Sequence, residues 1–154
     1  SDIFSLEFVG VQYNQSLVTF KIGEKRTQEQ IIDLALVRNV DNAFAELQKD
    51  NDVFKPKVPV LTVNPITAQI GMKEGLTGGE SFDVLEMVFN QNTGTTEYKK
   101  IGTATADKKI IWDNRYNAGE QAEQVLNKDG NPITATPFKG GKTIQPGMLL
   151  KQVK

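Results

Sequence analysis

The chain of 154 residues contains no cysteine and no histidine. Without cysteine it cannot form a disulfide, a thiolate zinc site or a thiol nucleophile. Without histidine it lacks the commonest general base and the commonest transition-metal ligand, so a Ser-His-Asp triad is impossible. These two absences exclude the most familiar catalytic and metal-binding groups. We therefore expect no enzyme activity, no bound metal and no cofactor.

The sequence also has little net charge and no long apolar run. Eighteen basic and nineteen acidic residues give a net charge of -1, which provides no global attraction to nucleic acid or to an anionic membrane. No apolar run approaches the roughly 18 residues that a transmembrane helix needs. Because the sequence starts Ser-Asp-Ile-Phe without methionine, we expect either a mature chain or an excised fragment.

A long amphipathic helix is the clearest local prediction. Thr27 and Gln30 have the spacing of a capping box, in which each side chain bonds the other residue's backbone amide. The helix should end at Asn51 and Asp52, shortly before Pro56. Apolar residues recur on one face at about 100° per residue, and we expect that face to be buried. Its members are Ile32, Leu36, Val40, Ala43, Phe44 and Leu47.

The polar residues of this helix permit two readings. Arg38 is spaced to pair with Asp41 or Asn42, and Asn39 falls near the apolar stripe, where it would need a hydrogen-bond partner. These residues either form a buried polar site or make structural contacts to a neighbouring loop.

The segments around the helix suggest a boundary in the chain. Residues 3–11 and 16–22 are rich in aromatic and β-branched residues and predict an N-terminal β-hairpin before the helix. Pro56 and Pro59 follow the helix and favour an extended backbone. We therefore expect a strand-strand-helix unit over residues 1–57 and a second domain over residues 58–154, giving an α+β chain.

The second domain has the pattern of a small antiparallel β-barrel. Residues 66–89 predict a strand, a turn and a strand that together form a hairpin. Gly75, Gly78 and Gly79 lie where the chain must reverse, and Leu76 between them should plug the core. Gly102 should mark a bulge in a later strand. The other expected strands cover residues 58–63, 98–106, 109–112, 133–136 and 148–153, with turn residues between them.

Two stretches of the sequence resemble known protein families. The run AQIGMKEGLTGGESFDV over residues 68–84, followed by KIG over residues 100–102, resembles the SH3-like barrel at the C-terminus of flagellar assembly protein T and related Gram-negative envelope proteins. The helix RNVDNAFAEL over residues 38–47 is similar to the tail of an α/β domain in envelope lipoproteins like the curli-secretion lipoprotein. The resemblance implies an SH3-like barrel with a long insertion over residues 113–141. It also implies a periplasmic or outer-membrane-associated location.

The best candidate for a binding surface is the segment from Trp112 to Tyr116. Tryptophan, tyrosine and arginine are enriched in binding hot spots, and arginine stacks on aromatic or planar groups. Trp112, Asp113, Arg115 and Tyr116 would form the contact patch. Alternatively, Trp112 ends a strand in the core, and Asp113 with Arg115 stabilises a turn.

Other polar groups favour plainer interpretations. Residues 127–131 lack the ligand spacing of a calcium loop and predict a hairpin turn at Asp129-Gly130. The lysines of the C-terminal half have only Tyr98 and Trp112 near them and are typical of solvated strand edges, so we expect no nucleic-acid binding. The carboxylates Glu74, Glu80, Asp83 and Glu86 have no pattern that would bring them together for acid–base chemistry.

These observations lead to two functional expectations. The first, which follows mainly from the resemblance, is a non-catalytic interaction or structural module of a bacterial cell-envelope protein, with a protein or a second copy as its partner. The alternative is a module that binds glycan or peptidoglycan through Trp112, Arg115 and Tyr116.

Overall fold

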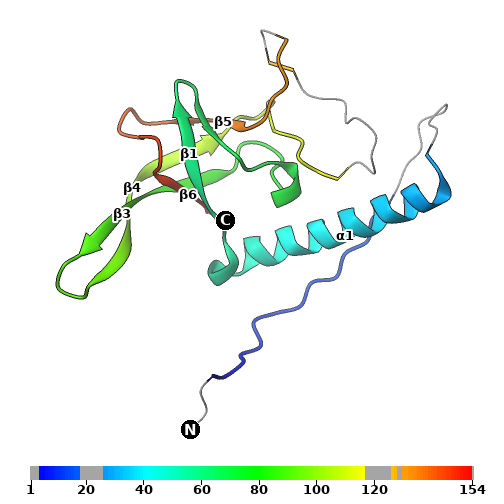
Figure 1. Ribbon diagram of the computed structural model, residues 1–154, viewed down its shortest axis with the longest axis horizontal. Coiled ribbons are helices and arrows are strands. Elements are labelled where there is room, and N and C mark those ends of the chain that lie inside the picture. The colour runs from blue at the N-terminus through cyan, green and yellow to red at the C-terminus, as the bar shows by residue number, and fades with distance from the viewer. Residues whose placement is uncertain (1–3, 18–25, 117–125, 128–129, 154) are drawn as a thin grey trace.

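The computed structural model describes residues 4–17, 26–116, 126–127 and 130–153. These residues form one α-helix beside a closed antiparallel β-barrel (Figure 1). The predicted α+β class with a small antiparallel barrel is therefore confirmed. In the part of the chain so described, no helix is long and apolar enough to cross a membrane.

The helix α1 spans Gln28–Asp50 and begins and ends as the sequence predicts. The backbone amide of Gln30 donates to the Thr27 hydroxyl at 3.3 Å, and the Thr27 amide donates to the Gln30 side chain at 2.8 Å. At the other end, the backbone amide of Asn51 donates to the Leu47 carbonyl at 3.1 Å. The capping box therefore fixes the first turn locally, without help from the barrel.

The expected burial of the apolar stripe of α1 is wrong for four of its six members, whereas Ala43 and Leu47 are half-buried. Within the helix, Leu34 and Ala45 are the buried residues. They lie eleven positions apart, which places them on one side at 100° per residue. Four other large apolar side chains of the helix remain 47–62% exposed, and we call them the α1 stripe. They are Ile32, Leu36, Val40 and Phe44.

The end of α1 is tied to the barrel by polar contacts. Lys49 Nζ donates to the Gly75 carbonyl at 2.6 Å. After the helix, a 3₁₀ turn, η1 (Asp52–Phe54), places Asp52 2.8 Å from Lys151 and 3.0 Å from Lys55. Hydrogen bonds from Lys151 and then Lys55 lower the pKa of Asp52 to about 2. The helix thus docks through a narrow apolar contact with charged groups around it.

Six strands close the barrel in the order β1-β2-β5-β4-β3-β6. Every neighbouring pair is antiparallel. Because the ring closes, the body of the barrel has no free strand edge. Beyond it, β3 after Leu85 and β4 before Ala104 pair only with each other. The strands are β1 (Lys57–Val63), β2 (Ile66–Ala68), β3 (Ser81–Asn90), β4 (Thr95–Ala106), β5 (Thr136–Gly140) and β6 (Leu149–Gln152).

Apolar side chains from all six strands fill the barrel. The rings of Phe82 and Phe138 meet edge to face, with centroids 5.1 Å apart. Leu76, from the glycine-rich connection, is 2% exposed and belongs to this core. The prediction that Leu76 plugs the barrel is confirmed.

The predicted hairpin over residues 66–89 is wrong in its pairing. Both strands exist, but β2 pairs with β1 and β5, whereas β3 pairs with β4 and β6. The connection between β2 and β3 contains the 3₁₀ turn η2 (Met72–Glu74), with Gly75 after it at φ 76°. A connection of this length and shape carries the chain from one side of the barrel to the other rather than back on itself.

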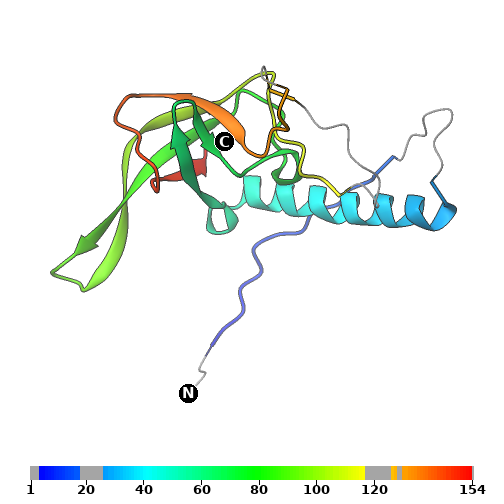
Figure 2. The same cartoon turned by 45° about the horizontal axis from the view of Figure 1, so that its top comes forward.

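The β3–β4 hairpin is the longest in the barrel, and its tip projects away from the body (Figure 2). Its register shifts where Val84 faces Gly102 and Leu85 faces Lys100, which leaves Ile101 as an extra residue. The bulge predicted at Gly102 is therefore confirmed.

The region expected as a long insertion differs from the prediction in two ways. No strand forms over residues 109–112, because the Asp107 carboxylate accepts from the amides of Lys109 and Ile110 and turns the chain there. Strand β5, in contrast, lies inside the expected insertion and closes the barrel. Leu126 and Pro132 form an isolated antiparallel β-bridge, as a hairpin around residues 129–130 requires. Residues 128–129 lie outside the described residues.

The predicted N-terminal hairpin is not confirmed. Residues 4–17 carry no strand, and residues 18–22 of the second predicted strand lie outside the described residues. Two strands alone bury too little apolar surface to be stable in water. The segment is instead attached to α1: Gln12 donates to Asp50 at 2.7 Å, and Ser16 to Asn39 at 3.4 Å. The partner that Asn39 was expected to need is thus Ser16.

Candidate functional site

The segment from Ile111 to Tyr116 lies between the barrel and α1. Ile111 is buried in the barrel core. The backbone amide of Trp112 donates to the Thr136 hydroxyl at 3.1 Å, and the Trp112 carbonyl accepts from the Met72 amide at 3.0 Å. Trp112 itself is half-buried. The backbone is therefore held from both sides before the chain reaches the predicted patch.

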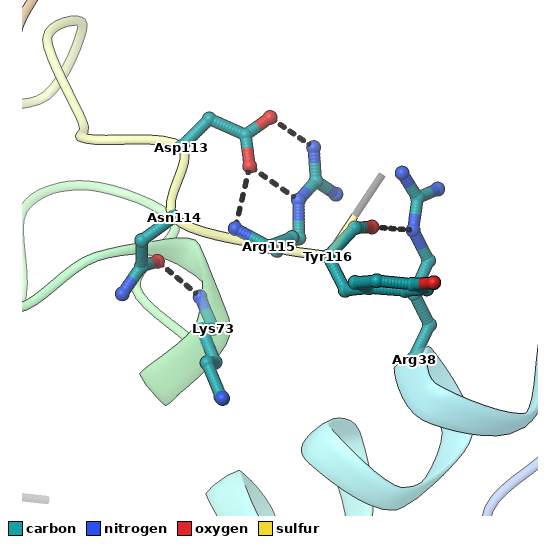
Figure 3. Close-up of polar contacts among 6 residues, drawn as sticks. All are labelled: Arg38, Lys73, Asp113, Asn114, Arg115 and Tyr116. Carbon is teal, nitrogen blue, oxygen red and sulfur yellow. Dashed lines mark hydrogen bonds and ion pairs between the residues drawn. The ribbon is translucent and has the colours of Figure 1, made fainter. Parts of the chain in front are cut away.

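Asn114 anchors this segment to the η2 turn. Its side-chain oxygen accepts from the backbone amide of Lys73 at 2.8 Å (Figure 3), and its Nδ2 donates to Glu74 Oε2 at 2.9 Å. The same carboxylate oxygen accepts from the Gly71 amide at 2.8 Å. A Cβ atom at Gly71 would lie 2.3 Å from the Trp112 carbonyl oxygen, so the two segments are in close contact.

Asp113 and Arg115 form a two-pronged ion pair on the outer side of the segment. Arg115 Nη2 donates to Asp113 Oδ2 at 2.6 Å and Nε donates to Oδ1 at 2.8 Å (Figure 3). The hydrogen bond from Arg115 holds the pKa of Asp113 below its ordinary range, and the same bond raises the pKa of Arg115. The alternative that this pair stabilises a turn is thus realised.

Arg38 joins the segment to α1. Its Nε donates to the Tyr116 backbone carbonyl at 3.4 Å (Figure 3). Burial lowers the pKa of Arg38, and the nearby positive charge of Arg115 lowers it further. Asp41, which was expected to pair with Arg38, lies 3.6 Å from Lys73. The positive charges of Arg115 and Arg38 both lower the pKa of Asp113.

A cavity of about 540 Å³ opens next to this segment. Of the four residues predicted for the patch, Arg115 lines it, and the other walls come from α1, the η2 turn and residue Asn14. Its volume lies in the usual range for small-molecule sites, roughly 300–1,000 Å³. The polar groups in its walls are Asn14, Asn42, Glu46, Lys49, Thr77 and Arg115.

The glycine-rich connection is not available as an anion site. The Glu80 carboxylate already accepts from the Thr77 amide and hydroxyl, each at 2.7 Å, and from the Gly78 amide at 2.9 Å. Burial would raise the pKa of Glu80, but these hydrogen bonds outweigh that effect and lower it. The chain's own carboxylate thus occupies the position that a phosphate would take in such a loop.

A second candidate surface is apolar and was not predicted as one. The α1 stripe is largely exposed, and the N-terminal segment separately exposes Phe4, Leu6 and Phe8 at 77–92%. The helical periodicity of the stripe was visible in the sequence, but it indicated a buried face. Glu74, Lys73 and Asn114 were also missed as partners, because nothing local signals a contact across about 40 residues.

In the described part of the chain, no three acidic or other ligand-type residues come close enough to hold a metal ion. No known protein-family model matches the chain, and no curated protein matches it either. The likeness to the flagellar and curli-related envelope proteins accordingly stays an expectation drawn from the sequence.

Proposed function

We propose that this chain is a non-catalytic interaction module of a bacterial cell-envelope protein, located in the periplasm or at the outer membrane. Its barrel would be of the SH3-like kind, and its partner a protein. The observation that supports an interaction role is the apolar surface made by the α1 stripe. The exposed apolar side chains of residues 4–8 form a second, separate surface. The envelope location rests on the sequence resemblance alone.

The size of that surface is the main argument for a partner. Monomeric soluble proteins rarely expose a continuous apolar patch larger than a few hundred Å². Here four large side chains are exposed along one helix face, at intervals of four residues. On a regular helix, positions four apart lie about 6 Å apart, one above the other. The side chains thus form a continuous row, as in grooves and faces that receive another polypeptide.

The proposal is tested by a photo-crosslinking amino acid at position 36 in cells that produce the protein. A discrete adduct of higher mass in the envelope fraction is expected. The matched control places the same amino acid at Lys142, on an exposed barrel loop. No adduct at position 36 beyond that of the control would count against an interaction role. An adduct confined to the cytosolic fraction would remove the envelope assignment.

The cavity beside Arg115 favours glycan binding as a second candidate function. Amides, a carboxylate and cationic groups line it, and such groups hydrogen-bond sugar hydroxyls. The expected result is saturable binding of peptidoglycan fragments in calorimetry, lost in Arg115→Ala and kept in Lys142→Ala. Trp112→Ala should matter less, because Trp112 does not line the cavity. Equal binding by wild type and Arg115→Ala would remove this candidate.

A further inference from the structure

The N-terminal segment is held to the end of α1 at residues 10–12, and the residues before them extend away from it. Gln12 bonds Asp50 near the end of α1, and Gly10 lies near Asn51. Before this point, residues 4–9 run past the helix and away from both the helix and the barrel (Figures 1 and 2). We call residues 4–9 the arm.

The arm has the side-chain pattern of a strand but stays strongly exposed in the part of the chain that the structure describes. Phe4, Leu6 and Phe8 alternate with polar residues and are 77%, 92% and 82% exposed. In an extended chain, alternate side chains point to the same side at intervals of roughly 6.6 Å. Glu7, the arm's charged residue, points to the opposite side. One face of the arm therefore presents a row of apolar side chains and carries no charge.

The α1 stripe is the matching surface in the same chain. Its side chains repeat every four residues, which is about 6 Å along the helix axis. Three apolar groups of an arm can therefore lie against three successive groups of a stripe. The chain's own arm does not reach its own stripe, because the arm is held at Gln12 and runs beyond the end of α1.

We propose that the arm of one copy packs on the α1 stripe of a second copy, and that the exchange is reciprocal about a two-fold axis. This inference rests on the proposed function and names a second copy of the chain as the partner. A two-fold exchange is self-complementary, since both surfaces are present in each copy.

The available area is consistent with a stable dimer. Four arm phenylalanines, two from each copy, would bury roughly 150–250 Å² each. The arm leucines and the covered helix faces add to this, which brings the total into the range of about 1,200–2,000 Å² that stable interfaces bury.

The absence of cysteine permits a direct test. Leu6→Cys and Leu36→Cys are made in separate chains, mixed and oxidised. A disulfide-linked dimer is expected in the mixture, with little from either variant alone. Leu6→Cys mixed with Thr103→Cys, an exposed position on β4, is the matched control. Cross-linking no stronger than in this control would overturn the proposal.

A second measurement does not depend on cysteine chemistry. Sedimentation of the wild type at up to about 100 µM should show a dimer with a micromolar dissociation constant. Phe8→Asp should raise that constant at least about tenfold, with an unchanged circular dichroism spectrum. A monomeric wild type would overturn the arm exchange, and so would a dimer unaffected by Phe8→Asp. If the protein is monomeric but position 36 still yields an adduct with another protein in cells, the interaction role survives without the exchange.

Discussion

Asn114 accepts a hydrogen bond from the backbone amide of Lys73 at 2.8 Å, across 41 residues of sequence. Together with the bond to Glu74, this contact determines where the Trp112–Tyr116 segment lies. The two residues belong to two connections that cross different parts of the barrel. The candidate polar site is therefore a product of tertiary structure rather than of a local motif.

Asn114→Ala should destabilise the fold by about 1–3 kcal/mol, because it leaves the Lys73 amide and the Glu74 carboxylate without this partner. Urea unfolding followed by circular dichroism measures the change. Gln91→Ala, in the exposed β3–β4 turn, is the control and should change stability by less than about 0.5 kcal/mol. Equal effects of the two substitutions would show that Asn114 does not anchor the segment.

Gly71→Ala should displace the Trp112 segment. The new methyl group would lie 2.3 Å from the Trp112 carbonyl oxygen and 2.6 Å from Asn114 Oδ1, and such crowding typically costs about 1–3 kcal/mol. Trp112 is the chain's single tryptophan, so its fluorescence reports the displacement directly. Gly102→Ala is the matched control, because no atom lies within 4 Å of its added methyl. An unchanged Trp112 emission in Gly71→Ala would refute the close contact.

Acid should destabilise the glycine-rich connection through Glu80. Its pKa in the folded chain lies below the ordinary 4.5. Its contribution to stability is therefore present above pH 4.5 and is lost as the pH falls through the folded-state pKa. Glu80→Gln should cost about 1 kcal/mol at neutral pH and should make the loss of stability below pH 4.5 shallower. Urea midpoints across pH 3–7 measure this, with Glu86→Gln on the outside of β3 as the control. An identical slope in wild type and Glu80→Gln would contradict the assignment.

The sequence predicted those features that depend on neighbouring residues. Thr27 and Gln30 are three positions apart and form their capping box within one turn, so local pattern was sufficient. The bulge at Gly102 and the burial of Leu76 in the barrel were also predictable, because a glycine in a strand and a leucine between glycines are each unusual.

Features that depend on which surfaces meet were not predictable in this way. The periodicity of α1 locates apolar positions but does not say which of them are covered. Leu34 and Leu36 are equally apolar, yet Leu34 is 1% and Leu36 62% exposed. The predicted pairing of β2 with β3 is wrong because strands that are adjacent in sequence are often, but not always, neighbours in the sheet. The anchoring role of Asn114 was not predicted, because its partners Lys73 and Glu74 are distant in sequence.

We propose that the α1 stripe is a binding surface and not part of the core. The most direct test compares the unfolding free energies of variants at Leu34 and Leu36. Urea unfolding is followed in dilute solution, where any dimer has dissociated. Leu34→Ala should cost about 2–5 kcal/mol, because Leu34 is buried. Leu36→Asp, at a side chain 62% exposed, should cost less than about 0.5 kcal/mol. A loss of 2 kcal/mol or more in Leu36→Asp would place the stripe in the core and contradict the account.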